Sequence, residues 1–316
     1  MSERFDLIVV GAGPAGLAAA IYGARARLKT LVLDEGVPGG QVKTTHKVSN
    51  YPGFPEDIKG SELAAAFARQ AERFGATIAR SVEITAADLG GLAAPEKRFV
   101  LDDEREVVAP AAIIATGARP RPLGVEGEAR FRGAGISYCA TCDGAYFEGK
   151  DIHVVGGGNS AVEESLFLTQ FARSVTIVHQ FAEFQAEASI AEEALRHPKI
   201  RVLWRHEPRG FHGETSLAVM RVEDLAAHAV HDLPTDGVFV FVGMAPQADL
   251  VKGLVPLNAW GYVETGEDMS TPVPGLYVAG DLRAKRFRQI TTAVADGTIA
   301  ALAAQKYLRD RYPSRP

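Results

Sequence analysis

Strand-like and helix-like patterns alternate along the 316-residue chain. A largely apolar run at residues 5–10 leads into a glycine-rich turn. The turn is followed by "LAAAIYGARAR", with helical spacing, and by the apolar run "KTLVL". A strand, a helix and a second strand in this order are typical of a βαβ unit with parallel strands. The pattern therefore predicts an α/β fold.

The same order of patterns recurs in the middle of the chain. The apolar "DIHVV" (151–155) leads into "GGGNSA", then the helical "VEESLFLTQFA", then the apolar "SVTIV" (174–178). Two units of one kind predict two Rossmann-like dinucleotide-binding domains, as in glutathione-reductase-type proteins.

Later strand signals place the second domain inside the first. They are "AAIIATGA", "DGVFVFVGMAP" and "GLYVAGD", and the last precedes a long amphipathic helix that closes the chain. If "GLYVAGD" returns to the first domain, residues 1–117 and 246–316 form one domain and residues 118–245 form the insertion. The Pro- and Gly-rich "GARPRPLGVEG" and "GMAPQAD" are the expected linkers.

Composition narrows the classes of function. The net charge of −5 provides no basic field for nucleic acid. No segment has the pattern of a signal peptide or the length of a membrane span, so we expect a cytoplasmic protein without a membrane partner. The two cysteines, Cys139 and Cys142, form one C-x-x-C, which in a reducing compartment favours redox or metal chemistry. Zinc would need two more ligands, and the histidines lack ligand spacing, so no metal is predicted.

The first glycine-rich turn has the G-x-G-x-x-G spacing between a strand and a helix. Its residues are Gly11, Gly13, Pro14, Ala15 and Gly16. Glycines at this spacing let a pyrophosphate approach the backbone at the positive end of the helix. Asp34 ends the next strand, where an acid takes ribose hydroxyls. This full context disfavours a glycine turn without a ligand.

The second glycine-rich turn, at residues 156–161, has the G-x-G-x-x-A form, but its next strand ends in His179. An acid at that place would hold an NAD ribose, and cations after it would hold the 2′-phosphate of NADPH. Residues 180–187 contain no cation. The alternatives are NADH held by Glu183, or a domain that keeps its shape and has lost its cofactor.

Cys139, Cys142 and Asp143 lie in "CATCDG", where we expect a helical turn to begin. At a helix start, backbone N–H groups lower the pKa of a thiol so that the thiolate attacks a disulfide. The second cysteine then resolves the mixed disulfide. Asp143 is a candidate proton donor and acceptor.

A third signal is Gly280-Asp281 at the end of the strand "LYVA". An aspartate there accepts a ribityl hydroxyl of a flavin, and the helix that starts near residues 288–290 directs its positive end at the pyrimidine side.

Together these motifs resemble the low-molecular-weight bacterial thioredoxin reductases. The resemblance runs from Phe5 to Leu308 through "GAGPAGLAAAIYGARA", "GVPGGQ", "SNYPGFP", "ATGA", "CATCDG", "GGGNSAVEESLFLTQFA", "DGVFVFVG" and "YVAGD…RQITTAVADGTIAA". It implies a homodimeric enzyme with FAD in the first domain. It also implies that the inserted domain carries the cysteine pair and swings between the flavin and thioredoxin.

The resemblance also implies the site residues. Cys142 faces the flavin, Cys139 attacks thioredoxin and Asp143 is the acid. FAD is held by the first glycine turn and by Asp34, Glu35, Gly40, Gln41, Asn50, the backbone near Val82, Ala115, Gly117, Gly280, Asp281, Arg288, Gln289 and Ile290.

The chain departs from that family after its second βαβ unit. Members that use NADPH have His-Arg-Arg, three further residues and another Arg, and those arginines align with Gln180, Phe181 and Gln185. Use of NADPH is therefore doubtful. The chain is similar to the ferredoxin-dependent flavin thioredoxin reductases, which implies a ferredoxin-like donor docked on "RPRPLG", "RFRG" or "LRAKRFRQ".

Three other functions fit the same motifs. They are an NADPH-dependent thioredoxin reductase with an atypical phosphate site, a flavin-dependent dithiol oxidase that passes electrons to oxygen, and a non-enzymatic flavin-binding redox sensor.

Overall fold

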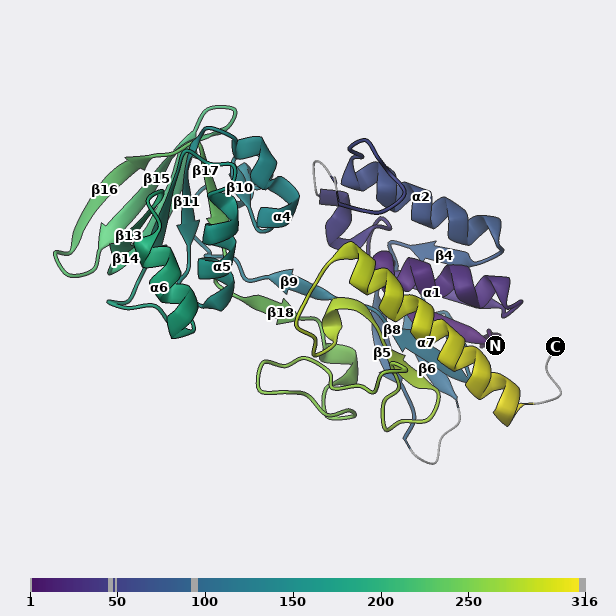
Figure 1. The fold of residues 1–316 in the computed structure, drawn as a ribbon. Coiled ribbons are helices and arrows are strands. Elements are labelled where there is room, and N and C mark those ends of the chain that lie inside the picture. Colours follow the sequence, from purple (N-terminus) through teal and green to yellow (C-terminus); the bar gives the residue numbers. More distant parts are fainter. Residues whose placement is uncertain (1, 45–47, 49, 92–95, 313–316) are drawn as a thin grey trace. The chain divides into compact units, whose positions relative to one another are not determined.

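The fold is described in a computed structural model that covers residues 2–44, 48, 50–91 and 96–312 (Figure 1). The chain divides into two compact units. Of the described residues, 2–44, 51–91, 96–119 and 245–312 belong to the first, and 48, 50 and 120–244 belong to the second. Strands β9 (Ala118–Pro120) and β18 (Met244–Pro246) pair with each other where the chain passes between the units.

The first unit is built on a parallel five-stranded sheet. Its order is β19 (Leu276–Val278), β8 (Ala111–Ile114), β2 (Leu7–Val10), β3 (Thr30–Asp34) and β4 (Thr77–Arg80).

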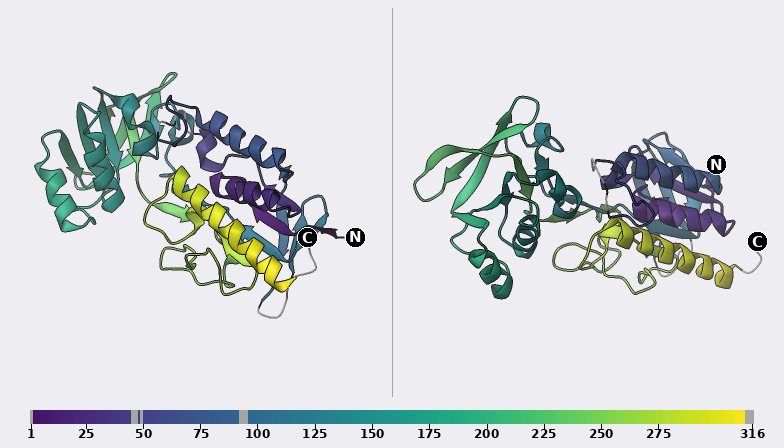
Figure 2. Two further views of the ribbon diagram at one scale, coloured as in Figure 1. Left: turned by 45° about the vertical axis from the view of Figure 1, so that its right-hand side comes forward. Right: turned by 45° about the horizontal axis from the view of Figure 1, so that its top comes forward.

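Alternate residues of these strands face two different layers. Leu7 and Val9 pack against the helices α1 (Pro14–Arg25), α2 (Gly60–Arg73) and α7 (Ile290–Arg311), and Figure 2 shows α7 running alongside α1. Ile8 and Val10 pack against a second sheet of β1 (Glu3–Arg4), β7 (Glu106–Ala109), β6 (Lys97–Leu101) and β5 (Ile84–Asp88). Short 3-10 turns lie at Gly40–Thr44 (η1), Asp249–Val251 (η3) and Gly280–Leu282 (η4).

The second unit repeats this layering. Its parallel sheet has the order β10 (Ile136–Ser137), β17 (Gly237–Val240), β11 (Asp151–Val155), β12 (Ser174–His179) and β13 (Ile200–Trp204). One face packs against α4 (Ala140–Asp143), η2 (Gly144–Phe147), α5 (Asn159–Leu168) and α6 (Ala188–Arg196). The other face packs against α3 (Glu128–Phe131) and an antiparallel sheet of β14 (His206–Gly213), β15 (Leu217–Asp224) and β16 (Ala229–Pro234).

The predicted α/β fold with two Rossmann-like units is confirmed, and the boundaries of some elements differ. α5 begins at Asn159 and ends at Leu168, whereas the apolar pattern indicated residues 162–172. The helix starts early because Gly158 is its N-cap, so the turn itself supplies the first helical residues. The antiparallel sheets were not predicted. β16 is exposed along most of its length and lacks an apolar face.

A buried histidine couples the stability of the second unit to pH. The ring Nδ1 of His153, in β11, lies 2.9 Å from the hydroxyl of Thr235. That hydroxyl donates its own proton to the carbonyl of Gly237, so the histidine ring must be the donor. Burial lowers the pKa of His153 to about 4, against an opposing effect of Asp151. The folded protein therefore holds this ring neutral at neutral pH.

We expect the free energy of unfolding to fall as pH drops from about 6.5 to 4. The unfolded chain takes up a proton on residue 153 over this range and the folded protein does not, which removes about 3 kcal/mol by pH 4. His153→Asn keeps a polar side chain that does not titrate, so it should lack this component. Urea unfolding at pH 7, 5.5 and 4.5 measures the free energy of unfolding of both proteins. If this free energy falls equally with pH in the wild type and in His153→Asn, the prediction is contradicted.

Candidate functional site

The two cysteines are joined by a disulfide in the structure. Cys139 is the N-cap of α4, and the same short helix carries Cys142 and Asp143. The N–H of Asp143 donates to the carbonyl of Cys139 at 3.1 Å, and Ala140 between them is buried against the sheet. Cys139 and Cys142 are half-buried, while Ala140 between them is anchored in the core. The predicted helical turn at this motif is present, and it brings both cysteines and the aspartate together.

A buried serine, absent from the sequence-based site, fixes this motif from β10. The hydroxyl of Ser137 accepts the backbone N–H of Cys139 at 3.1 Å and donates to a carboxylate oxygen of Asp143 at 2.6 Å. Ser137 is paired with Phe239 of β17 and is only 6% exposed. The sheet therefore holds both the backbone of one cysteine and the carboxylate of the neighbouring acid.

The first glycine-rich turn is shaped to let atoms approach closely. A Cβ added at Gly16 would lie 1.8 Å from the carbonyl oxygen of Gly11. Gly11 has φ +101°, and its Cβ would lie 2.5 Å from the carbonyl of Ala115. Gly40 comes from η1 to meet Gly13, where a Cβ would lie 3.0 Å from the Gly13 Cα. Two other segments, at Ala115 and at η1, thus converge on this turn.

The N-terminus of α1 is suited to an anion. Its N-cap is Gly13, Pro14 occupies the first helical position, and the first turn carries no acidic residue. No side chain among the described residues caps this end, so its N–H groups can bind the oxygens of a pyrophosphate.

Asp34 supports the turn from the end of β3. Its two carboxylate oxygens accept the N–H groups of Ala12 at 2.6 Å and Gly36 at 2.9 Å. Its carbonyl accepts the N–H of Val82 at 3.1 Å, which brings the predicted segment near Val82 to the same edge. The neighbouring Glu35 is exposed. Asp34 thus has a structural role beside any contact with ribose.

Behind the turn, Gly280 and Asp281 are held by buried charges that the sequence did not reveal. Asp296 of α7 accepts the N–H of Gly280 at 3.1 Å and pairs with Arg283 at 2.9 Å and with Lys285 at 3.0 Å. Lys285 also lies 3.1 Å from Asp281. A Cβ at Gly280 would lie 2.8 Å from the Cβ of Ala15, so this cluster fixes the Gly280 turn against α1.

At the start of α7, Arg288 stacks over Tyr262, with 4.1 Å from the guanidinium carbon to the ring centroid. Its Nε is buried and has no hydrogen-bond acceptor among the described residues. Gln289 is the helix cap, forming a capping box with Thr292, and Ile290 begins the helix. A buried donor without an acceptor fits a site completed by a ligand.

Three predicted residues are less tightly placed. Gln41, in η1, and Asn50 are exposed, and Asn50 groups with the second unit. Ser49, from the same quoted motif as Asn50, lies outside the described residues. Gly117 has open space where a Cβ would point.

In the second unit, the segment after β12 folds back over the glycine-rich turn. The imidazole of His179 packs on Gly157, where a Cβ would lie 2.3 Å from the ring. The N–H of Gln185 donates to the carbonyl of Gly157 at 2.8 Å, and the N–H of Glu187 donates to the side chain of Asn159 at 2.7 Å. His179 is nearly buried among the rings of Phe181, Phe184 and Trp204.

Comparison with known proteins identifies this arrangement. The model of the pyridine nucleotide-disulphide oxidoreductase family matches residues 5–297. The chain belongs to this family. It is an FAD-dependent disulfide oxidoreductase of the thioredoxin reductase type, with Cys139 and Cys142 as its cysteine pair.

Individual relatives are similar to this chain in sequence over nearly their whole length. The chain is 42% identical to the thioredoxin reductase of Bacillus subtilis, covering 98% of this chain and 97% of the relative. It is 43% identical to the "34.2 kDa protein in rubredoxin operon" of Clostridium pasteurianum, covering 97% and 98%. The thioredoxin reductase of Streptococcus pyogenes superposes with a TM-score of 0.89 at 37% identity, covering 98% of this chain and 100% of that one.

In the basic clusters that the sequence offers for docking a ferredoxin-like donor, several cations have partners within the protein. In "LRAKRFRQ", Arg283 and Lys285 belong to the buried charge cluster, and Arg286 is the exposed cation. In "RFRG", Arg130 donates to the carbonyl of Glu214, and Arg132 lies over Tyr138. Both arginines of "RPRPLG" are exposed. The sequence could not distinguish cations with an internal partner from those on the surface.

The structure brings one cation that the sequence did not indicate, Arg205, to the segment that folds over the second glycine turn. The N–H of Arg205, just after β13, donates to the carbonyl of Phe181 at 3.1 Å, and Arg205 is exposed. It is remote from His179 in sequence, and only the pairing of β12 with β13 brings it to this segment.

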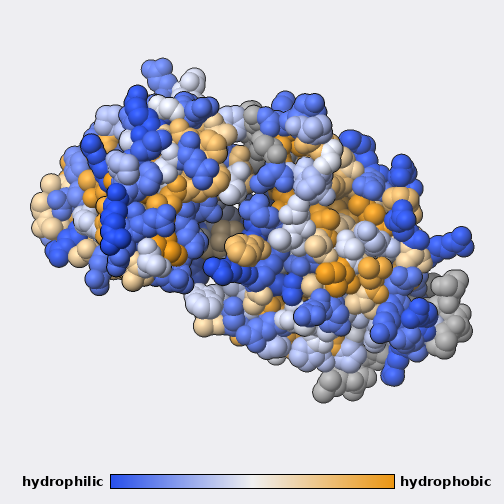
Figure 3. All heavy atoms as spheres, in the orientation of Figure 1, coloured by the Kyte–Doolittle hydropathy of each residue, from blue (hydrophilic) through white to orange (hydrophobic). Residues whose placement is uncertain are grey.

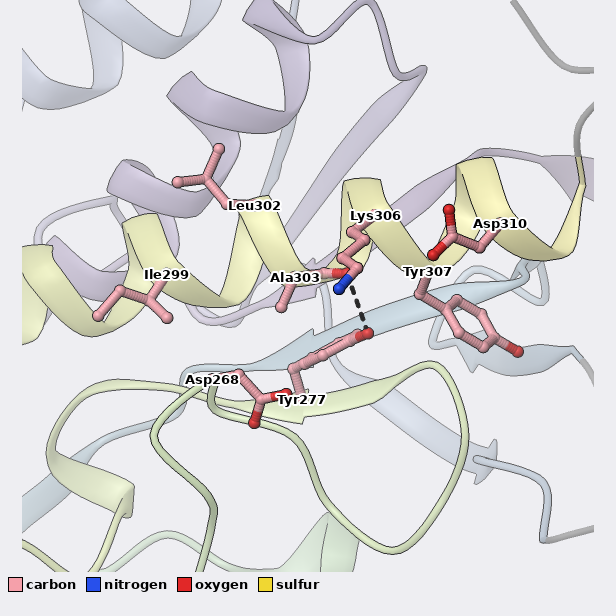
Figure 4. Close-up of a pocket in the computed structure, with 8 residues that line it drawn as sticks. All are labelled: Asp268, Tyr277, Ile299, Leu302, Ala303, Lys306, Tyr307 and Asp310. Atoms are coloured by element: carbon pink, nitrogen blue, oxygen red, sulfur yellow. Dashed lines mark hydrogen bonds between the residues drawn. The ribbon is translucent and has the colours of Figure 1, made fainter.

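A surface groove of about 510 Å³ lies along α7, and none of the predicted site residues lines it (Figure 4). Ile299, Leu302 and Lys306 line it from the helix, and Tyr277 crosses beneath to donate to the carbonyl of Ala303 at 3.2 Å. The space-filling view shows apolar residues among polar ones over α1 and α7 (Figure 3). Among the described residues, no helix combines the length and apolar character that crossing a membrane requires.

Proposed function

We propose that this flavoprotein reduces the disulfide of thioredoxin and receives its electrons from a reduced ferredoxin-like protein instead of NADPH. The Cys139–Cys142 disulfide beside Asp143 supports the first part. The cation-free segment folded over the second glycine turn supports the second. We further propose a cytoplasmic homodimer.

The residues converging on the first glycine turn are those we assign to FAD. The uncapped N-terminus of α1 would hold the pyrophosphate, and Asp281 would hold the ribityl chain. Asp34 and Glu35 would bind the adenosine ribose. Arg288 would donate to an acceptor atom on the flavin side. When bound, FAD would supply the two electrons that break the Cys139–Cys142 disulfide, and uptake of two protons gives the two thiols.

The protein residues then carry out a thiol–disulfide exchange. Asp143 takes the proton of the Cys139 thiol, and the Cys139 thiolate attacks one sulfur of thioredoxin. The thioredoxin disulfide breaks, a mixed disulfide forms, and the departing sulfur takes the proton from Asp143. Cys142 attacks Cys139, its proton passes to the second thioredoxin sulfur, and the internal disulfide forms again.

The donor proposal rests on charge at the second glycine turn. The 2′-phosphate of NADPH needs charge-assisted hydrogen bonds, each contributing about 1.5–3 kcal/mol. Gln180, Phe181 and Gln185 offer no cation, so several decades of affinity are lost. The Clostridium pasteurianum relative is named for a rubredoxin operon, a gene context that suits an iron–sulfur protein as electron donor.

Arg205 favours a second candidate, an NADPH-dependent reductase with an atypical phosphate site. Its backbone N–H binds the carbonyl of Phe181 and its side chain is exposed, so the fold brings to this segment a cation that the local sequence lacks.

Anaerobic mixing of the oxidised holoenzyme with each donor distinguishes the two candidates. We expect reduced ferredoxin to bleach the flavin absorbance rapidly, and NADPH or NADH at micromolar concentration to leave it unchanged. Replacing Gln180, Phe181 and Gln185 together by arginine should create a response to NADPH. Fast bleaching of the wild-type protein by NADPH, lost in Arg205→Ala, would establish the atypical phosphate site instead.

A further inference from the structure

We propose that Ser137 is a positioning residue for the disulfide exchange, and this rests on the proposed role of Asp143. One hydroxyl contacts two functional groups. It accepts the N–H of Cys139 at 3.1 Å and donates to the carboxylate of Asp143 at 2.6 Å. A serine hydroxyl has a single proton, and the 2.6 Å contact to the carboxylate is much shorter than the 3.3 Å to the carbonyl of Cys139. The proton of Ser137 is therefore directed to Asp143.

The position of Ser137 in the sheet makes this contact rigid. β10 pairs with β17 through Ser137 and Phe239, and the serine is 6% exposed. α4 has only four residues, so it has little stability of its own and depends on such tertiary contacts for its geometry. Ser137 links the start of α4 at Cys139 to its end at Asp143. The carboxylate thereby keeps one orientation relative to the cysteines as the disulfide opens and closes.

The hydroxyl also affects when Asp143 holds a proton. A hydrogen bond donated to a carboxylate favours its ionised form. Loss of the hydroxyl makes the carboxylate easier to protonate, so the alkaline limit of an acid-dependent step moves to higher pH. Tyr146 is one titratable group that interacts with this carboxylate, and its pKa is raised by burial and by Asp143. Tyr146 thus stays neutral in the range of interest. The thiols of Cys139 and Cys142 share the same short helix and titrate as well once the disulfide is open.

The test compares Ser137→Ala with two matched variants. Ser137→Thr keeps a hydroxyl at a strand position that suits a β-branched residue. Ser165→Ala removes another fully buried serine of the same unit, whose hydroxyl donates to the carbonyl of Ala161 and has no role at the cysteines. The holoenzyme is reduced anaerobically with dithionite and mixed in single turnover with thioredoxin, or with the small disulfide 5,5′-dithiobis(2-nitrobenzoate), between pH 6 and 9.

We expect Ser137→Ala to lower the exchange rate about ten- to hundredfold, which is part of the full contribution of a general acid. The alkaline limb of the pH–rate profile should move upward by about one pH unit. Ser137→Thr should keep most of the wild-type rate and pH profile. Ser165→Ala should change neither the rate nor the profile. An unshifted profile, or a rate loss matched by Ser165→Ala, overturns the proposal.

The proposed function can fail separately. In that case the wild type would not reduce thioredoxin, whereas the rate and pH profile with the small disulfide would still report whether Ser137 acts on the cysteine pair.

Discussion

Cys142→Ser and Cys139→Ser are each expected to lower thioredoxin reduction at least about 10⁴-fold, as when one member of a catalytic unit is removed. A serine hydroxyl at either place cannot form the disulfide that transfers the electron pair. The fold should persist, because both side chains are half-exposed and the buried anchor of this motif is Ala140. Steady-state turnover under the best donor measures the loss, with the flavin spectrum and circular dichroism as controls for folding.

The two variants should differ in what they trap. Cys142→Ser leaves Cys139 without its resolving partner, so a covalent adduct with thioredoxin should accumulate. Cys139→Ser should give little adduct if Cys139 is the attacking residue. Mass spectrometry under non-reducing conditions separates these results, and an adduct found mainly with Cys139→Ser would reverse the assigned roles. Turnover above about one per cent in either variant would contradict the dithiol mechanism itself.

Residues required by local backbone geometry were predictable from sequence. Gly11 and Gly16 stand in the fingerprint because neighbouring carbonyls lie within 2.5 Å of where a Cβ would be, and such requirements appear as fixed spacings. The same holds for "CATCDG", whose residues are joined within one turn. The absence of arginine after β12 was equally visible, since it concerns adjacent residues.

Residues brought together by tertiary structure were not predictable. Asp296 holds Gly280 from the second turn of α7, and Arg205 reaches Phe181 through the pairing of two strands. Ser137 precedes the cysteines by two residues, yet a serine is common in any strand and nothing local marks it. The cations Arg283 and Lys285 were interpreted as a docking surface because a sequence does not show which charges are paired internally.

Gly297→Ala is expected to lower the free energy of unfolding by about 3 kcal/mol or more, since overpacking here involves backbone. In an unconstrained helix this change would stabilise by up to about 1 kcal/mol. Here the new Cβ would lie 1.9 Å from the carbonyl oxygen of Ala15 and 2.8 Å from its carbonyl carbon. Backbone atoms cannot rotate away, so α7 must move off α1.

Gly23→Ala, in α1, is the matched control. Its new Cβ would meet the side-chain ends of Leu7 and Thr30 at 2.9 Å, which can shift, so a smaller loss is expected. Urea unfolding compares the two variants. Because Ala15 also contacts the Gly280 turn, Gly297→Ala should weaken FAD binding as well, measured by titrating the apoprotein with FAD. Equal losses of stability would show that α1 and α7 separate easily, and unchanged FAD affinity would show that the glycine turn does not depend on their close packing.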